Sequence, residues 1–474
     1  MTFSRAIFFA ATAVTSAAGL NVLKYTTTPN GFYNAPRGFN TWPIQANPLT
    51  TPSWTGFDES NVKAQCGVLG QPDFQAAGYK YCSLDSGWSQ DGGDENGRIL
   101  YNAATFDLPE LGDWLHGRGL SLGVYILPGF FCSDANKTII GTDIPLGSIW
   151  NGNDNGFLRC DIDTAKDGSQ EWHDSIIELF AEWGVDFIKL DFVTPGSPDN
   201  GGHLSPDTSG QVVQYHNAIQ KVGRPMRLDI SWKLDRSDPY YNIWKANADS
   251  FRTDQDLNNQ GEATFIHWKT VQRAIDNYRQ YIELQIPKNE PLSIYPDLDN
   301  VNVGNPEATT GVSDAQRQTI MTHWIGTAAN LITGSDLTSL DTLGRNLLTN
   351  PQAMAVADFT AKYPVQPRNP GTGGTSAQQL QAWIAGPSDD QAGEAVVIMA
   401  NYGPDEGDGG FGQPLPGVQN VNVTLEDLGI DGKAWLWRSI WDGASGTVGV
   451  DGELSFDLDE GESVLLRLTP APAY

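Results

Sequence analysis

Residues 186–190 read Asp-Phe-Ile-Lys-Leu and are followed by Asp191 and Phe192, and this stretch decides the fold. It is an apolar run of strand length with a carboxylate directly at its C-terminal end. Lys189 lies two residues before Asp191, so the period-two geometry of a strand places both side chains on one face. A cation there lowers the pKa of the neighbouring carboxyl group and keeps it ionised, as a nucleophile requires. A structural Lys–Asp ion pair is the competing interpretation.

Similar runs flank this stretch between residues 30 and 340. The eight expected strands are 36–39, 79–84, 121–127, 186–190, 226–230, 250–252, 292–295 and 330–334. Amphipathic segments such as 175–183 and 264–279 lie between them and indicate helices. This alternation builds a parallel sheet, and eight units predict an α/β fold, a (β/α)8 TIM barrel over residues 30–363. The alternative, an open doubly wound sheet, normally has a glycine-rich phosphate turn after its first strand, and none is visible.

The character of the sequence changes after Tyr363. Residues 364–376 are rich in Pro, Gly and Thr, which predicts a linker. The runs 394–400, 433–440 and 463–468 then alternate as strands do, with Gly/Asp turns between them. They predict a C-terminal antiparallel β-sandwich over residues 377–474.

Composition narrows the classes of partner. The 474 residues carry a formal net charge of −28, with 39% hydrophobic and 10% aromatic residues, so a disordered chain is excluded. The excess of acids repels phosphate backbones and anionic lipid headgroups, so neither nucleic acid nor a membrane surface is expected as a partner. A neutral sugar is compatible with this charge. The oligomeric state stays open.

The N-terminus has the pattern of a secretory signal peptide over residues 1–18. Arg5 supplies the positive charge, residues 6–14 are apolar, and residues 16–18 are small. The apolar part is too short to span a bilayer, and a buried N-terminal helix is the alternative. We therefore expect a secreted, extracellular protein, and the sequons at Asn136 and Asn422 fit a glycoprotein.

Four cysteines allow three disulfide pairings in an oxidising compartment. Cys132 with Cys160 is favoured because the two bracket a Gly/Asn/Asp-rich excursion that a crosslink would hold. Cys82 lies in an apolar run and is expected to be a buried thiol. With six His and no zinc-site spacing, no metal site is expected.

Acids and aromatics recur after the expected strands, where side chains point into the mouth of a barrel. Two carboxyl groups and aromatic faces are the groups needed to cut a glycosidic bond. Asp191 is the candidate nucleophile, and either Asp254 or Asp256 is the candidate acid/base. Spacing does not choose between them, and a helix N-cap is the alternative for Asp254. Trp42 and Trp232 are candidates for stacking on a sugar ring, with core packing as the alternative.

Three more polar residues have groups that could hold sugar hydroxyls. Asp85 and Asp297 offer acceptors, and Ser86 offers a hydroxyl. A turn or cap role is the alternative for each of them.

These motifs together resemble the retaining α-galactosidases of glycoside hydrolase family 27, secreted barrels with a C-terminal β-sandwich. Residues 38–42, GFNTW, are similar to the family's opening GWNSW, and residues 183–191, WGVDFIKLD, are similar to its nucleophile strand WGVDYLKYD. Further segments resemble the family in order and spacing: 161–163, 296–297, 304–305 and 333–337. The family places its acid/base four residues after an arginine, which implies Asp256 after Arg252.

The resemblance implies a double displacement without a cofactor, through a covalent glycosyl-Asp191 intermediate. The two carboxyl groups should then stand about 5 to 5.5 Å apart. The expected substrates are terminal α-D-galactopyranosyl residues of oligosaccharides or polysaccharide side chains. By motif, the residues lining the sugar subsite would be Trp42, Asp85, Tyr125, Lys189, Arg252 and Asp297.

Two departures from the family pattern bear on specificity. The family usually has two acids, which hold the 4- and 6-hydroxyls of galactose, where this chain has Asp85 and Ser86. The loss of one charge-assisted hydrogen bond to the sugar lowers the binding free energy by about 1.5 to 3 kcal/mol. A β-L-arabinopyranosidase or an enzyme for another α-linked pyranose is therefore an alternative. Ser231 stands where the family often has Glu, which leaves room for the acetamido group that an α-N-acetylgalactosaminidase accepts, although Lys233 and Leu234 do not follow that pattern. A non-catalytic carbohydrate-binding protein is the alternative from a different class.

Overall fold

The computed structural model describes residues 19–196, 203–370 and 376–472. The expected signal peptide, residues 1–18, lies outside the described residues. Within the described ranges, no helix has both the length and the apolar character that crossing a bilayer demands.

A parallel sheet of eight strands forms the barrel. Its strands are β1 (Arg37–Asn40), β2 (Tyr81–Leu84), β5 (Ser121–Ile126), β9 (Val185–Leu190), β10 (Arg227–Ile230), β11 (Ser250–Arg252), β12 (Tyr295–Asp297) and β13 (Leu331–Thr333). Their order in the sheet is β12-β11-β10-β9-β5-β2-β1-β13. The ring closes where the Asn330 N–H donates to the Pro296 carbonyl at 3.2 Å, between the two terminal strands. The expected TIM barrel is confirmed, with β12 three residues later than its expected start.

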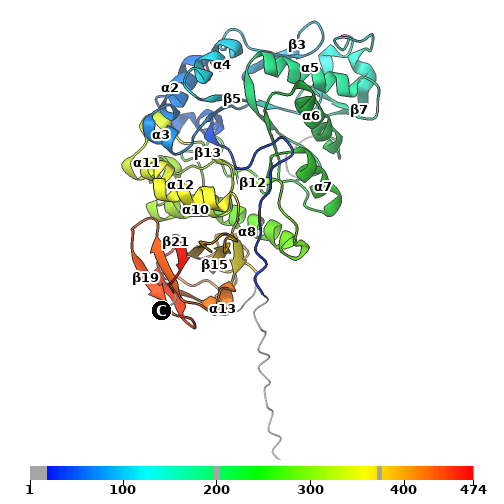
Figure 1. Cartoon of the computed structure of the whole chain (residues 1–474). Coiled ribbons are helices and arrows are strands. Elements are labelled where there is room, and N and C mark those ends of the chain that lie inside the picture. Colours follow the sequence, from blue (N-terminus) through cyan, green and yellow to red (C-terminus); the bar gives the residue numbers. More distant parts are fainter. Residues whose placement is uncertain (1–18, 197–202, 371–375, 473–474) are drawn as a thin grey trace, which may run out of the picture.

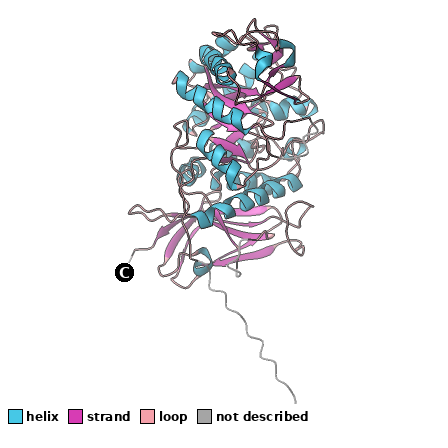
Figure 2. Cartoon of the chain, turned by 90° about the vertical axis from the view of Figure 1, so that its right-hand side faces the viewer, coloured by secondary structure: helices cyan, strands magenta, loops and turns pink. Residues whose placement is uncertain are grey.

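Helices cover the outside of the barrel (Figures 1 and 2). The longer ones are α2 (Glu59–Leu69), α4 (Leu108–His116), α5 (Ser169–Glu182), α6 (Ser209–Val222), α7 (Asp238–Asn247), α8 (Trp268–Gln285), α10 (Asp314–Gly326), α11 (Thr342–Thr349) and α12 (Pro351–Thr360). Shorter ones are α1 (Trp42–Ala46), α3 (Pro72–Ala76) and α9 (Glu307–Thr310). Local chemistry fixes several ends: the Asp107 carboxylate caps α4 by accepting the Glu110 N–H at 3.0 Å.

Two small sheets extend the connections that follow β2 and β5. The first pairs β3 (Ser89–Gly93) with β4 (Ile99–Tyr101), and the second contains β6 (Phe130–Phe131), β7 (Trp150–Asp154) and β8 (Arg159–Ile162). The expected disulfide Cys132–Cys160 is confirmed and lies in the second. The expectation of a free thiol at Cys82 is wrong. Cys82 on β2 is bonded to Cys66 on α2, a partner that only the packing of helix on sheet brings near.

The C-terminal part is antiparallel, as expected. Its elements are β14 (Gln366–Arg368), β15 (Leu380–Ala385), β16 (Ala395–Asn401), β17 (Gln419–Thr424), α13 (Leu425–Leu428), β18 (Trp435–Ser439), β19 (Ser445–Val448), β20 (Glu453–Leu458) and β21 (Glu462–Pro470). A six-stranded sheet, β14-β15-β16-β21-β18-β19, packs over the pair β17-β20 around a shared apolar core. Strand β14 lies inside the stretch 364–376, whose composition indicated a linker. The C-terminal part lies beside α10 of the barrel (Figure 1). The Thr319 hydroxyl of α10 donates to the Gly461 carbonyl at 2.6 Å and joins the two parts.

Candidate active site

Strand register gathers the candidate side chains in the mouth of the barrel. Lys189 on β9 pairs with Tyr125 on β5 and with Asp229 on β10, so the three side chains share the inner face. One tier further, the Asp191 N–H donates to the Ile126 carbonyl and the Ser231 N–H to the Leu190 carbonyl, each at 2.9 Å. Asp191 and Ser231 therefore continue the inner face at the C-terminal ends of β9 and β10.

Lys189 and Asp85 form an ion pair inside the barrel. The Lys189 Nζ lies 2.9 Å from Asp85 Oδ2, which also accepts the Asn40 Nδ2 hydrogen at 3.0 Å. Burial opposes the charge of Lys189, but Asp85, Asp191 and Asp256 together raise its pKa. Lys189 is therefore a permanent cation between the carboxylates. The sequence left open whether Lys189 supports a nucleophile at Asp191 or forms a structural ion pair with it. The ion pair of Lys189 in the structure is with Asp85.

The Asp191 carboxylate is held from two sides. Its Oδ1 accepts the backbone N–H of Phe192 at 2.9 Å, and the Tyr125 phenol hydrogen-bonds to it as well. Burial, with Asp191 and Asp85 nearby, raises the pKa of Tyr125 well above its ordinary value, so the phenol keeps its proton and remains a donor. Asp191 itself is buried. These donors stabilise a carboxylate in one orientation.

Arg252 at the end of β11 gathers a second group of acids. One guanidinium nitrogen, Nη2, lies 3.1 Å from Asp256 Oδ1 and 3.4 Å from Asp299 Oδ2, and Nε lies 4.0 Å from Asp297 Oδ2. Asp299 Oδ2 also accepts the Leu257 N–H at 2.7 Å, which fixes the loop that carries Asp256. Asp299 is one of the polar residues that follow the expected strands, two positions after Asp297, but the sequence motifs assigned it no role.

Asp256 has the environment of a proton donor. Burial raises its pKa most; Arg252 lowers it, while Asp299 and Asp191 raise it, and the result is a pKa of about 6. About a third of the side chain, 34%, is exposed, so it can exchange protons with solvent. The charge of Asp191 contributes to the raised pKa of Asp256, so the two carboxyl groups lie near each other.

Asp254, the alternative acid, lies elsewhere. It is fully buried, with Oδ2 accepting from Arg273 Nε and Oδ1 from Asn277 Nδ2, each at 2.9 Å. Both partners are on α8, which begins at Trp268 with His267 as its N-cap. Asp254 therefore neither faces the barrel mouth nor caps that helix, and it joins the helix to the loop.

The remaining candidates surround these groups. Trp42 is the first residue of α1 and is half-buried, and its backbone N–H donates to Asn40 Oδ1 at 2.9 Å. Ser86 is exposed beside Asp85, whereas the Ser231 hydroxyl is buried without a hydrogen-bond partner in the described structure. Asp297 is buried, and burial raises its pKa. Trp232, half-buried, stacks on Phe192 with ring centroids 5.2 Å apart.

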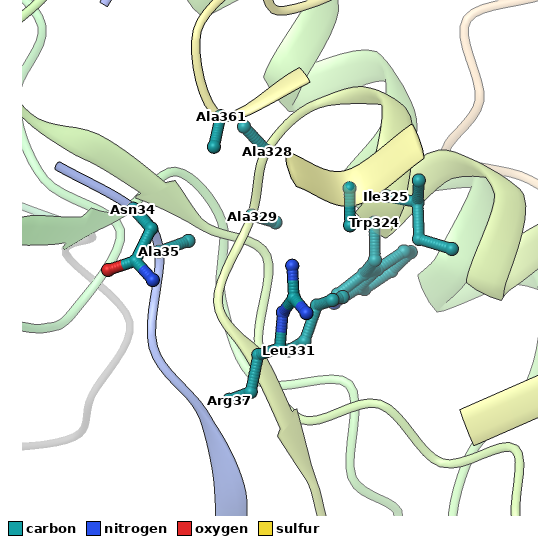
Figure 3. A pocket seen from close by; sticks show the side chains of 10 residues that line it. Asn34, Ala35, Arg37, Trp324, Ile325, Ala328, Ala329, Leu331 and Ala361 are labelled. Carbon is teal, nitrogen blue, oxygen red and sulfur yellow. The ribbon is translucent and has the colours of Figure 1, made fainter. Parts of the chain in front are cut away.

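A separate pocket lies at the other end of the barrel. Figure 3 shows it next to Arg37 and Leu331, the first residues of β1 and β13, with Trp324 in its wall. None of the candidate catalytic side chains lines it. In the three described ranges, no three His, Cys, Asp or Glu side chains are arranged to hold a metal ion.

Comparison with known proteins identifies the family. The model of the family described as "Alpha galactosidase A" matches residues 55–141 and 150–358. The chain is also 52% identical over 458 residues to "Alpha-galactosidase 3" of Hypocrea jecorina, which covers 95% of this chain and 73% of the relative. The chain belongs to this family. It is therefore a glycoside hydrolase, as its motifs indicated.

Further known proteins are similar to the chain in sequence or in fold. The "Putative alpha-galactosidase 8" of Emericella nidulans is 41% identical over 86% of this chain and 82% of the relative. A GH27 β-L-arabinopyranosidase structure from Geobacillus stearothermophilus has a TM-score of 0.75 at 22% identity, covering 93% of this chain and 98% of that one. An α-galactosidase structure from Saccharomyces cerevisiae with raffinose has a TM-score of 0.65 at 15% identity, covering 94% and 100%. These structures share the fold.

Proposed function

We propose that the protein is a secreted, retaining exo-α-galactosidase that removes terminal α-D-galactopyranosyl residues. The observation that carries the proposal is the pair Asp191 and Asp256, two acids in opposite surroundings at one barrel mouth. Asp191 is held by donors suited to a carboxylate, whereas Asp256 has a pKa raised to about 6. A fixed carboxylate beside a protonated acid is what a double displacement uses.

In the first step, a carboxylate oxygen of Asp191 attacks the anomeric carbon and forms a glycosyl ester. The bond from this carbon to the leaving oxygen breaks, and Asp256 gives its proton to that oxygen. In the second step, Asp256 takes a proton from water while the water oxygen attacks the same carbon and releases Asp191. Two inversions leave the sugar with retained configuration.

Several features support the proposed substrate and location. The two fungal relatives carry α-galactosidase names, and galactose-bearing oligosaccharides or polysaccharide side chains are the proposed substrates. Half-buried Lys189 and buried Asp85, together with Arg252 and Asp297, offer the charged donors and acceptors that sugar hydroxyls need. The two disulfides suit an oxidising compartment, and both sequon residues, Asn136 and Asn422, are exposed.

The decisive experiment replaces the nucleophile. Asp191→Asn should abolish hydrolysis of an aryl α-galactoside with an unchanged melting temperature, while Asp113→Asn, an exposed acid on α4, should have no effect. NMR of the wild-type reaction should show the α-anomer of galactose first. Full turnover by Asp191→Asn, or a first product of inverted configuration, would reject the mechanism.

Ser86 favours a second candidate, a β-L-arabinopyranosidase. Asp85 already pairs with Lys189 and Asn40, and its exposed neighbour Ser86 offers no charge to a hydroxymethyl group. β-L-Arabinopyranose is the galactose shape without that group. Comparing kcat/KM for aryl α-galactoside and aryl β-L-arabinopyranoside decides between the two, and Ser86→Asp should shift the ratio toward galactose.

A further inference from the structure

Three aromatic rings from separate elements form a continuous row at the rim of the barrel. Phe192 directly follows Asp191 after β9, and Trp232 directly follows Ser231 after β10. Their rings stack with centroids 5.2 Å apart and an interplanar angle of 12°. Phe157, in the turn between β7 and β8, continues the row, with its centroid 4.7 Å from that of Phe192. We call these three side chains the aromatic row.

The turn that carries Phe157 is held in place by several bonds. Asn155 Oδ1 accepts the N–H of Phe157 at 3.0 Å and the N–H of Arg159 at 3.2 Å. The Cys132 N–H donates to the Leu158 carbonyl at 3.0 Å, and the Cys132–Cys160 disulfide ties the base of the turn to β6. The row is therefore pre-organised, which lowers the entropy cost of binding a ligand.

Core packing does not account for this arrangement. Phe157 is 38% exposed and its neighbour Leu158 is 63% exposed, and within the described chain the row packs on itself apart from the main hydrophobic core. Leu158 and Phe192 also have positive φ angles of 63° and 53°. Such backbone costs about 1 to 3 kcal/mol per residue and tends to persist where function requires it.

The position of the row relates it to the reaction. The Phe192 N–H holds Asp191 Oδ1, so one residue both orients the proposed nucleophile and places the central ring of the row. The Lys189–Asp85 ion pair lies one tier deeper in the barrel than Asp191. A group attached to the anomeric carbon of a bound sugar must therefore extend toward the rim, where the row lies.

We propose that Phe157, Phe192 and Trp232 form a leaving-group subsite that binds a pyranose ring linked to the departing oxygen. Pyranose rings have an apolar C–H face that stacks on aromatic side chains. The row would therefore favour galactosyl oligosaccharides over galactosides with a small aliphatic aglycone. This inference rests on the proposed function.

The test uses Phe157, the most remote ring of the row from Asp191 along the contacts described. Phe157→Ala should lower kcat/KM five- to tenfold for an α-galactosyl-glucose disaccharide. It should leave kcat/KM for methyl α-galactoside unchanged. Phe157→Trp should restore the disaccharide value. Tyr33→Ala is the matched control, because Tyr33 is 77% exposed just before β1, at the opposite end of the barrel. Equal losses for both substrates, or no loss for either, would overturn the subsite.

A second readout separates the subsite from the proposed function. Calorimetric binding of the same two ligands is compared between Asp191→Asn and Asp191→Asn with Phe157→Ala. If adding Phe157→Ala weakens the affinity for the disaccharide alone five- to tenfold, the subsite is supported. If the wild type also hydrolyses neither ligand, only the proposed function is rejected. Unchanged affinity, or no binding of either ligand, rejects the subsite.

Discussion

Neutralising Asp299 should shift the pH dependence of hydrolysis without removing a reacting group. Asp299 and Asp256 share the Arg252 Nη2 atom, at 3.4 and 3.1 Å, and the Asp299 charge raises the pKa of Asp256. In Asp299→Asn that repulsion disappears, and the charge of Arg252 is shared only between Asp256 and Asp297 among these three acids. Both changes favour the ionised form of Asp256, so its pKa should fall.

The magnitude follows from the distances. The two carboxylate oxygens are separated by no more than the sum of the two contacts with Nη2, about 6.5 Å. At an effective dielectric constant of about 20, unit charges at that separation repel by about 2.6 kcal/mol, or nearly two pKa units. A third of the Asp256 side chain is exposed, so solvent screens part of this, and we expect a fall of about one unit.

The assay is the pH profile of kcat/KM with methyl α-galactoside, whose departing oxygen needs a proton. A general acid must be protonated, so activity falls as pH rises through its pKa, near 6 in the wild type. In Asp299→Asn this alkaline limb should lie about one unit lower. The leaving group of a dinitrophenyl α-galactoside needs no proton, so kcat/KM for this substrate should show little dependence on the pKa of Asp256 in either protein. An alkaline limb that stays in place or moves to higher pH would refute the reasoning.

Three further outcomes are expected. The folded pKa of Asp256, about 6, exceeds that of an ordinary carboxyl group, so the stability contributed by its proton is lost as pH rises from the ordinary carboxyl range to about 6. Asp256→Asn should therefore raise the free energy of unfolding by about 1 kcal/mol at pH 7 but not at pH 4, by calorimetry. Asp254→Asn should cost about 3 kcal/mol in urea unfolding, because it removes the carboxylate that balances the charge of Arg273, yet it should keep the alkaline limb in place. Cys66→Ser with Cys82→Ser opens a crosslink across 16 residues and should cost about 3 kcal/mol in the same assay.

Sequence patterns predict the barrel well because its strands are short apolar runs, which can be recognised from the local sequence alone. The strand expected at 292–295 lies at Tyr295–Asp297 instead. Its position depends on residues on either side of β11: the Tyr295 N–H donates to the Asp249 carbonyl, and the Asp297 carbonyl accepts the Thr253 N–H. This pairing depends on the position of β11, which a pattern read from the residues around β12 alone does not include.

Residues of the site were accessible from sequence only where a strand fixes their direction. Lys189 and Asp191 follow from period-two alternation. The choice of Asp256 over Asp254 needed the family motif, because both lie in a loop whose course depends on Arg252 and Asp299. Phe157 and Phe192 are 35 residues apart, and only the β7–β8 turn folding back over β9 brings their rings together.

The charge balance of the barrel mouth explains why a protonated acid exists there. Two cations, Lys189 and Arg252, face more carboxyl groups than they can neutralise: Asp85, Asp191, Asp229, Asp256, Asp297 and Asp299. In a medium of low dielectric constant the excess negative charge is costly, so some of these acids hold their protons to a higher pH than an ordinary carboxyl group does. Burial and Asp297 raise the pKa of Asp229 well above its usual range, but Asp229 lies one tier below the mouth. Asp256 is the member with a third of its side chain open to solvent, so its proton is the one that substrate and water can reach.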